Sequence, residues 1–201
     1  MSKTLIWWEK TVEYLFILKY TTLNTFAAPF DGTIEALGDA IFSNKDSWVL
    51  IEFKRSVKEL DSEKEKYINY EELEKQLSIL DYFHFLIYGE NVNGNLDIKA
   101  KTYFSRTEED TSKVLSSGCP DPNIFNAYLK KIYEAKKSGG SLGESDFAVV
   151  AGVNRSGQIT QTLSVANYLR AVNAHELAKK LELEQQARTQ AIKNTGIRRK
   201  R

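Results

Sequence analysis

Two short apolar runs separated by a polar turn stand near the start of the chain. Residues 33–42 and 48–53 have the length and the β-branched or aromatic content of strands, and the SNKD stretch at 43–46 has the size of a hairpin turn. Further strands are predicted at 84–89, at 96–104, and on both sides of the NRSG turn at 154–157. The pattern therefore predicts several short strands, two pairs of which are hairpins.

Helical patterns alternate with these strands. Residues 4–23 lack Gly and Pro and are apolar nearly all round, which predicts either a largely buried helix or a helix packed on a sheet. Residues 61–83 are expected to form one helix, capped by Asp61-Ser62 and Glu63. A third helix is predicted to begin at Asp121-Pro122 and to stop at Gly139 and Gly140, and a long fourth helix covers about 164–193.

The order of these elements predicts the fold class. Helices and strands follow one another as α-β-β-α-β-(β)-α-β-β-α, which favours a mixed central β-sheet flanked by helices, an α/β (α+β) fold. We expect one domain over 1–160. Residues 161–201 then supply the end of the last hairpin, a long helix and a basic tail.

Composition excludes several classes of protein. A 42% apolar share and 11% aromatic residues are globular values, and a single cysteine, Cys119, cannot form an intramolecular disulfide. The apolar patch at the N-terminus is too short for a signal peptide and nothing approaches a membrane span. We therefore expect a soluble cytoplasmic protein that is not associated with a membrane.

The net charge of +1 is unevenly distributed. The last nine residues hold five of the 28 lysines and arginines and none of the 27 acids, so the remaining 192 residues sum to −4. The body is not a basic nucleic-acid-binding module, and only the tail is expected to be attracted to polyanions.

Charged residues interrupt the first two predicted strands. Asp39 lies in the first, and Glu52 and Lys54 lie in the second at i and i+2, so they share one face of it. Charges on apolar strands are costly unless they are paired or bind a metal. Two carboxylates can hold Mg²⁺ or Mn²⁺, and a neighbouring lysine can orient or help to deprotonate an attacking water, which is the chemistry of phosphodiester hydrolysis.

The acid-x-lysine triplet at 52–54 is distinguished by its context. Such triplets also occur at 97–99 and at 134–136. The triplet at 134–136 lies on a predicted surface helix, and the one at 97–99 has no preceding strand that ends in an acid. Only the triplet at 52–54 follows a strand with Gly38-Asp39 and lies between two predicted helices. The competing interpretation is a structural Glu–Lys pair at a sheet edge, with Asp39 capping a turn.

In this arrangement the chain resembles the PD-(D/E)XK nuclease superfamily, which has the restriction-endonuclease-like fold. The pattern of that superfamily is a helix with an acid, a strand with Asp, a strand with (D/E)-x-K, and a further helix that can add a polar residue. The resemblance covers about residues 5–90, with Gly38-Asp39 in place of the nominal Pro-Asp. It implies a restriction-endonuclease-like mixed sheet and a Mg²⁺- or Mn²⁺-dependent nuclease.

The resemblance also implies roles for individual residues. Asp39 and Glu52 look like metal ligands, with the backbone carbonyl of Phe53 as a third, and Lys54 looks like the catalytic lysine. The acid of the first helix is ambiguous. Glu13 is preferred over Glu9, because it lies deeper in the apolar stretch.

Three further positions are candidates with open alternatives. Glu35 shares the face of Asp39 if that strand is regular. Gln76 resembles a glutamine found in the following helix of some branches, and its alternative is a solvated helix residue. Tyr82 is a weaker candidate in the same region.

Two functions from different classes follow. The first is a nuclease that acts on DNA in a prokaryotic or phage restriction, defence or repair system. The second is a catalytically degenerate nuclease-fold subunit that serves in binding or complex assembly. The C-terminal helix can pack on the domain or pair with another protomer or a partner protein, and both interpretations stay open.

Overall fold

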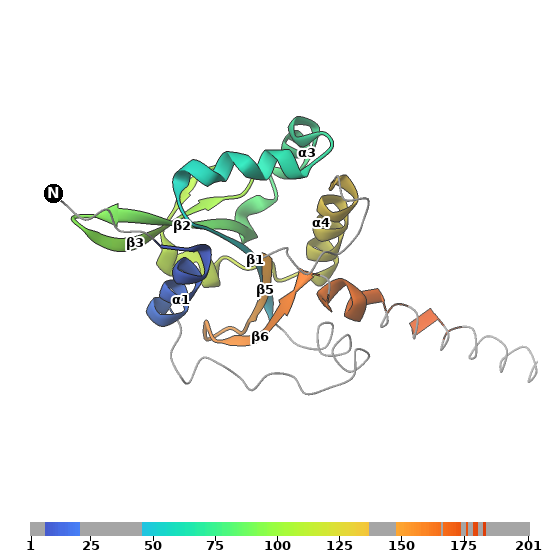
Figure 1. Cartoon of the computed structure of the whole chain (residues 1–201). Coiled ribbons are helices and arrows are strands. Elements are labelled where there is room, and N and C mark those ends of the chain that lie inside the picture. The colour runs from blue at the N-terminus through green and yellow to red at the C-terminus, as the bar shows by residue number, and fades with distance from the viewer. Residues whose placement is uncertain are drawn as a thin grey trace, which may run out of the picture.

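One mixed sheet forms the centre of the molecule (Figure 1). The computed structural model describes residues 7–20, 46–136, 148–165 and 167–173, together with positions 176, 179, 180 and 183. Within these residues the sheet has six strands in the order β4-β3-β2-β1-β5-β6. The strands are β1 (Ser47–Lys54), β2 (His84–Val92), β3 (Asn95–Thr102), β4 (Glu108–Glu109), β5 (Ala148–Val153) and β6 (Ile159–Ser164).

Only one neighbouring pair of strands in this sheet is parallel. β1 runs parallel to β2, whereas β2–β3, β3–β4, β1–β5 and β5–β6 are antiparallel. A parallel pair requires a crossover connection, which residues 55–83 supply with the 3-10 helix η1 (Val57–Lys66), helix α3 (Tyr70–Leu77) and the short 3-10 helix η2 (Asp81–Phe83). This crossover passes over the face of β1 that carries Glu52.

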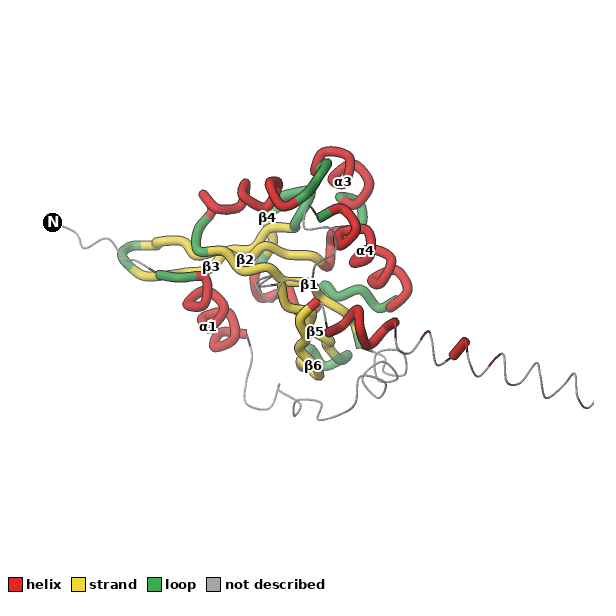
Figure 2. The backbone as a smooth tube through the Cα atoms, turned by 45° about the vertical axis from the view of Figure 1, so that its right-hand side comes forward, coloured by secondary structure: helices red, strands yellow, loops and turns green. Residues whose placement is uncertain are grey.

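Helical elements cover both faces of the sheet (Figure 2). One face packs against η1, α3 and α4 (Pro122–Ala135) through an aromatic-rich core that includes Trp48, Phe104 and Phe125. The other face packs against α1 (Glu9–Tyr20) and the 3-10 helix η3 (Thr111–Ser116). The mixed α/β sheet flanked by helices that the element order predicts is therefore confirmed at this level.

The alternation of side chains along β1 assigns its residues to the two cores. Val49, Ile51 and Phe53 belong to the core under α1. Trp48 and Leu50 belong to the core under α3 and α4. Because successive strand side chains point to opposite faces, Glu52 and Lys54 continue the row of Trp48 and Leu50. Both charged side chains therefore lie on the η1 side of the sheet.

Several sequence expectations are confirmed. β1, β2 and the β5–β6 hairpin occupy the predicted stretches, and β3 covers most of 96–104. α4 begins as expected, with the Asp121 side chain accepting a hydrogen bond from the backbone N–H of Asn123 at 2.8 Å. The helix ends earlier than expected, at Ala135, and the glycines at 139 and 140 lie outside the described residues.

The prediction of one continuous helix over 61–83 is wrong. Tyr67 has an extended backbone (φ −108°, ψ 152°), and the N–H of Ile68 donates to the carbonyl of Ala135 at 3.0 Å. This contact ties the connection to the end of α4 and separates η1 from α3. Asn69 then starts α3 as its N-cap, accepting from the N–H of Glu72 at 3.3 Å. A local helical pattern did not reveal this long-range contact.

Of the two alternatives for the first helix, packing on the sheet is confirmed. On α1, Val12 and Phe16 are buried against the sheet whereas Tyr14 and Leu18 are exposed, so the helix packs by one side. Residues 105–120, to which the sequence pattern assigns no helix or strand, contain β4 and η3. The predicted strand at 33–42 lies outside the described residues.

Candidate functional site

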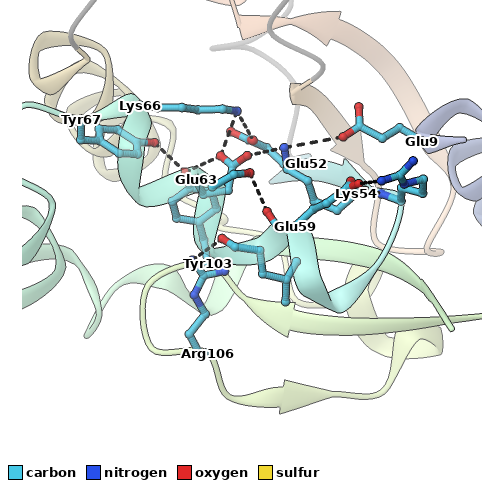
Figure 3. A network of polar contacts seen from close by, with 12 residues as sticks. Glu9, Glu52, Lys54, Glu59, Glu63, Lys66, Tyr67, Tyr103 and Arg106 are labelled. Atoms are coloured by element: carbon cyan, nitrogen blue, oxygen red, sulfur yellow. Dashed lines mark hydrogen bonds and ion pairs between the residues drawn. The ribbon is translucent and has the colours of Figure 1, made fainter.

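Glu52 and Lys54 belong to a cluster of charged residues between β1 and η1 (Figure 3). The ammonium group of Lys54 forms an ion pair with the carboxylate of Glu63, and the carboxylate of Glu9 lies 3.7 Å from the same ammonium. The side chain of Lys54 is 11% exposed and that of Glu63 is fully buried. The lysine predicted to be catalytic is therefore held between two carboxylates from different elements.

Glu63 is the residue that the other members of the cluster share. It contacts Lys54, and its Oε2 lies 2.9 Å from the Nζ of Lys66. The Tyr103 hydroxyl donates a hydrogen bond to the same Oε2 at 2.7 Å, and the hydroxyl of Tyr67 lies 2.9 Å from that of Tyr103. Buried carboxylates are tolerated when they are paired and hydrogen-bonded in this way.

Lys66 links the two buried acids. Its Nζ lies 3.0 Å from Oε2 of Glu52 and 2.9 Å from Oε2 of Glu63. In Figure 3, Lys66 reaches the cluster from η1 and Glu9 reaches it from the opposite side. Glu9, Glu52 and Glu63 thus face two lysine ammonium groups, those of Lys54 and Lys66.

The environment moves the pKa values of the two buried acids in opposite directions. Burial and the negative charge of Glu63 raise the pKa of Glu52 to about 7, although Lys66 opposes this shift. Burial also acts to raise the pKa of Glu63, but its hydrogen bonds and the charges of Lys66 and Lys54 outweigh burial and lower that pKa. Lys66 has a raised pKa because its two carboxylate partners outweigh its own burial. A proton near neutral pH is therefore held by Glu52 rather than by Glu63.

Of the two acids on α1, Glu9 is the one that lies beside Lys54. Glu13, preferred from the sequence, instead pairs with Lys10 at 2.7 Å on its own helix. The start of α1 is fixed nearby, because the Trp7 indole donates to the carbonyl of Arg55 at 2.5 Å. A Cβ on Gly89 would lie 2.3 Å from that indole nitrogen, so glycine at 89 permits this close approach. The geometry therefore favours Glu9 over Glu13.

The remaining candidates do not join the cluster in the described part of the chain. Asp39 and Glu35 lie outside the described residues. Gln76 is exposed on α3 and donates to Glu72 at 2.9 Å. Tyr82 is the middle residue of η2, is 46% exposed, and packs its ring against that of Phe83. Phe53 lies between Glu52 and Lys54 on β1, with its ring buried on the α1 side.

Both edges of β1 are paired with other strands. β2 pairs with residues 50–54 and β5 pairs with residues 47–52, so residues 50–52 have partners on both sides. The sequence places Asp39 on a strand next to β1, and that pairing would need an open edge. Along residues 50–52 the described strands leave none.

The donor chemistry of the cluster fits part of a magnesium site. Glu52 offers a hard carboxylate oxygen, which suits Mg²⁺ or Mn²⁺. Within the described ranges, however, no three His, Cys, Asp or Glu side chains lie close enough together to hold an ion. The described residues alone therefore do not form a metal centre at Glu52.

Reasoning from sequence missed the two η1 members of the cluster. From the sequence, Glu63 is expected only as part of a helix cap, and Lys66 is given no role. In a 3-10 helix, residues three apart lie above one another, so Leu60, Glu63 and Lys66 share a face. Leu60 and Glu63 are indeed the buried residues of η1. The three-residue spacing was visible in the sequence, but it becomes informative only once the helix type is known.

Comparisons with known proteins identify no relative. No family model, no curated protein and no solved structure matches this chain. Within the part of the chain that the structure describes, no helix combines the length and the apolarity that crossing a bilayer requires.

Proposed function

We propose that this chain is a nuclease that uses Mg²⁺ or Mn²⁺ to hydrolyse phosphodiester bonds of DNA. The observation that carries the proposal is the burial of Glu52 and Lys54, two residues apart on one face of β1, within a cluster of three acids and two lysines. Replacing buried ion pairs by apolar residues is often neutral or stabilising. A cluster of this kind, with one strongly perturbed carboxylate, is therefore a reasonable candidate for a functional site.

The arrangement of elements supports a restriction-endonuclease-like core. α1 packs on one face of the sheet, β1 carries the Glu-x-Lys triplet, and a helical crossover leads to the parallel strand β2. This order is the one expected from the resemblance, apart from the Asp39 strand. Both edges of β1 are occupied along residues 50–52, by β2 and by β5.

In the proposed reaction each residue has a definite task. Asp39, Glu52 and the Phe53 carbonyl would hold the cation, which would supply Lewis-acid activation of the phosphate and of a bound water. The Lys54 ammonium, held by Glu63 and Glu9, would orient the attacking water or stabilise the charge that develops on the phosphate. Glu9 takes the place that the sequence assigned to Glu13.

A second candidate function is a nuclease-fold subunit that has lost catalysis and serves in binding or assembly. It is favoured by one specific observation, namely that both lysines of the cluster are already neutralised by carboxylates. In that case the cluster would be a structural polar network and no cleavage would depend on it.

Cleavage of supercoiled plasmid DNA with Mg²⁺, with Mn²⁺ and with EDTA tests the proposal. Lys54→Met should abolish metal-dependent nicking. Lys99→Met is the matched control, because Lys99 belongs to the same kind of triplet on β3 but is half-exposed, 3.8 Å from Glu90. Nicking that survives equally in both variants would refute the role of Lys54, and the absence of nicking under any condition would favour the assembly subunit.

A further inference from the structure

Tyr103 is the most rigidly held of the side chains that contact Glu63 (Figure 3). Its side chain is fully buried, and its ring stacks on that of His84, with the ring centroids 4.0 Å apart and the planes 8° from parallel. Its backbone N–H donates to the carbonyl of His84 at 2.8 Å. The Tyr103 hydroxyl therefore has a fixed position, whereas Lys54 and Lys66 reach Glu63 through long side chains with several rotatable bonds.

The donors in this part of the cluster follow from the number of protons. Tyr103 has one hydroxyl proton, and it donates that proton to Oε2 of Glu63 at 2.7 Å. The hydroxyl of Tyr67, 2.9 Å from that of Tyr103, must therefore be the donor in the contact between the two tyrosines. A chain of hydrogen bonds that runs from Tyr67 through Tyr103 to a buried carboxylate strengthens each of its members by polarisation.

The two oxygens of the Glu63 carboxylate have separate partners. Oε2 accepts from Tyr103 and pairs with Lys66, and Oε1 pairs with the ammonium group of Lys54. The last torsion of a glutamate side chain is broad, so the carboxylate can rotate unless a fixed donor holds one of its oxygens. Tyr103 supplies that donor at Oε2, which leaves Oε1 directed at Lys54.

We propose that Tyr103 is a positioning residue, which orients the ammonium group of Lys54 for the reaction by fixing the carboxylate of Glu63. This inference rests on the proposed function, because it takes Lys54 as the catalytic lysine. Because the side chain of Tyr103 is fully buried, it cannot contact DNA itself. Loss of its hydroxyl should therefore slow the chemical step and leave DNA binding as it is, which lowers kcat at an unchanged KM.

Steady-state nicking of supercoiled plasmid with Mg²⁺ by the full chain tests this inference. Tyr103→Phe removes only the hydroxyl and keeps the stacked ring, and we expect kcat to fall about tenfold or more, because small displacements of a catalytic group are costly. Tyr168→Phe is the matched control, because Tyr168 is a fully buried tyrosine of the same core whose hydroxyl donates to Asn126 at 2.7 Å. Measured below the melting temperature of both variants, Tyr168→Phe should keep the kcat and KM of wild type.

The outcomes separate the inference from the proposed function. Equal kcat values in Tyr103→Phe and Tyr168→Phe, or a change in KM alone, would overturn the role of Tyr103 and leave a nuclease that depends on Lys54 intact. No nicking by wild type would overturn both. If Tyr103→Phe does not fold, Tyr67→Phe decides instead, because it keeps the bond from Tyr103 to Glu63 and removes the donor behind it. A smaller fall in kcat would then support the inference, and an unchanged kcat would overturn it.

Discussion

Replacing Glu63 by Gln removes the negative charge that Lys54 and Lys66 share. Gln has nearly the same shape, and its carbonyl can still accept the Tyr103 hydroxyl that now lies 2.7 Å from Glu63. The loss is therefore one of charge. It leaves Lys54, whose side chain is 11% exposed, with only the Glu9 carboxylate at 3.7 Å. Lys66 retains Glu52 at 3.0 Å.

The size of the expected loss of stability follows from the burial of Glu63 and of its partner Lys54. Removing one member of a buried ion pair costs about 3–5 kcal/mol, because the other charge remains buried without compensation. Since Glu9 compensates Lys54 in part, we expect the free energy of unfolding to fall by about 3 kcal/mol. For a chain of this size that is a drop in melting temperature of roughly 6–12 °C.

Urea and thermal unfolding followed by circular dichroism measure this loss. Glu59→Gln is the control, because Glu59 pairs with Arg55 in a half-exposed position and should contribute no more than about 1 kcal/mol. A double-mutant cycle with Lys54→Met adds a second check, since Lys54→Met should cost less in the Glu63→Gln background than in wild type. If Glu63→Gln lowers the free energy of unfolding by less than about 1 kcal/mol and the effects in the cycle are additive, Glu63 is not the residue that stabilises the buried lysines.

Three further predictions concern the titration of Glu52, the α1 acids and the basic tail. Burial raises the pKa of Glu52 to about 7, whereas the unfolded chain releases this proton above about pH 4.5. Protonated Glu52 therefore stabilises the folded state, and this contribution to the free energy of unfolding is lost as pH rises from 4.5 through 7. Urea titrations should show wild type losing about 2 kcal/mol relative to Glu52→Gln between pH 5 and pH 8. The buried His84 has a lowered pKa, which makes stability rise with pH, but His84 is present in both proteins and its effect cancels in the comparison. Parallel pH profiles of wild type and Glu52→Gln would contradict the raised pKa of Glu52. Glu9→Gln should reduce plasmid nicking more than Glu13→Gln, and the reverse order would restore the choice made from sequence. Deleting residues 194–201 removes four positive charges and should flatten the log–log salt dependence of DNA binding by up to about 3–4 units, whereas an unchanged slope would remove the tail from the interface.

The strands were predictable because their signals are local. β1 and β2 are apolar runs bounded by polar turns, and the NRSG turn fixes the β5–β6 hairpin, where Gly157 has φ +75°. Asp121 before Pro122 identified the start of α4 for the same reason, since a cap needs only the next few residues. The pairing of β1 with β5 joins residues about 100 positions apart, and no local pattern could reveal it.

The candidate site was predictable only for its strand residues. The i, i+2 spacing of Glu52 and Lys54 places them on one face of any strand. Their partners depend on how η1 crosses the sheet, which brings Glu63 and Lys66 over β1. The choice between Glu9 and Glu13 depends on the docking of Trp7 against Gly89, a packing detail that the helix pattern does not contain.

Two acid-x-lysine triplets on strands of the same sheet show why burial decides the argument. On β3, Asp97 pairs with Lys19 at 2.5 Å and Lys99 lies 3.8 Å from Glu90, and all four side chains are between 39% and 50% exposed. Such exposed ion pairs contribute little to folding stability and require little desolvation, so they can persist without a function. On β1 the same pattern carries its charges into a core, where it needs Glu63, Lys66 and Tyr103 to be tolerated. The equivalent triplet on β3 does without such a network, and the proposed chemistry at Glu52 and Lys54 would give the buried network on β1 a function that the exposed pairs lack.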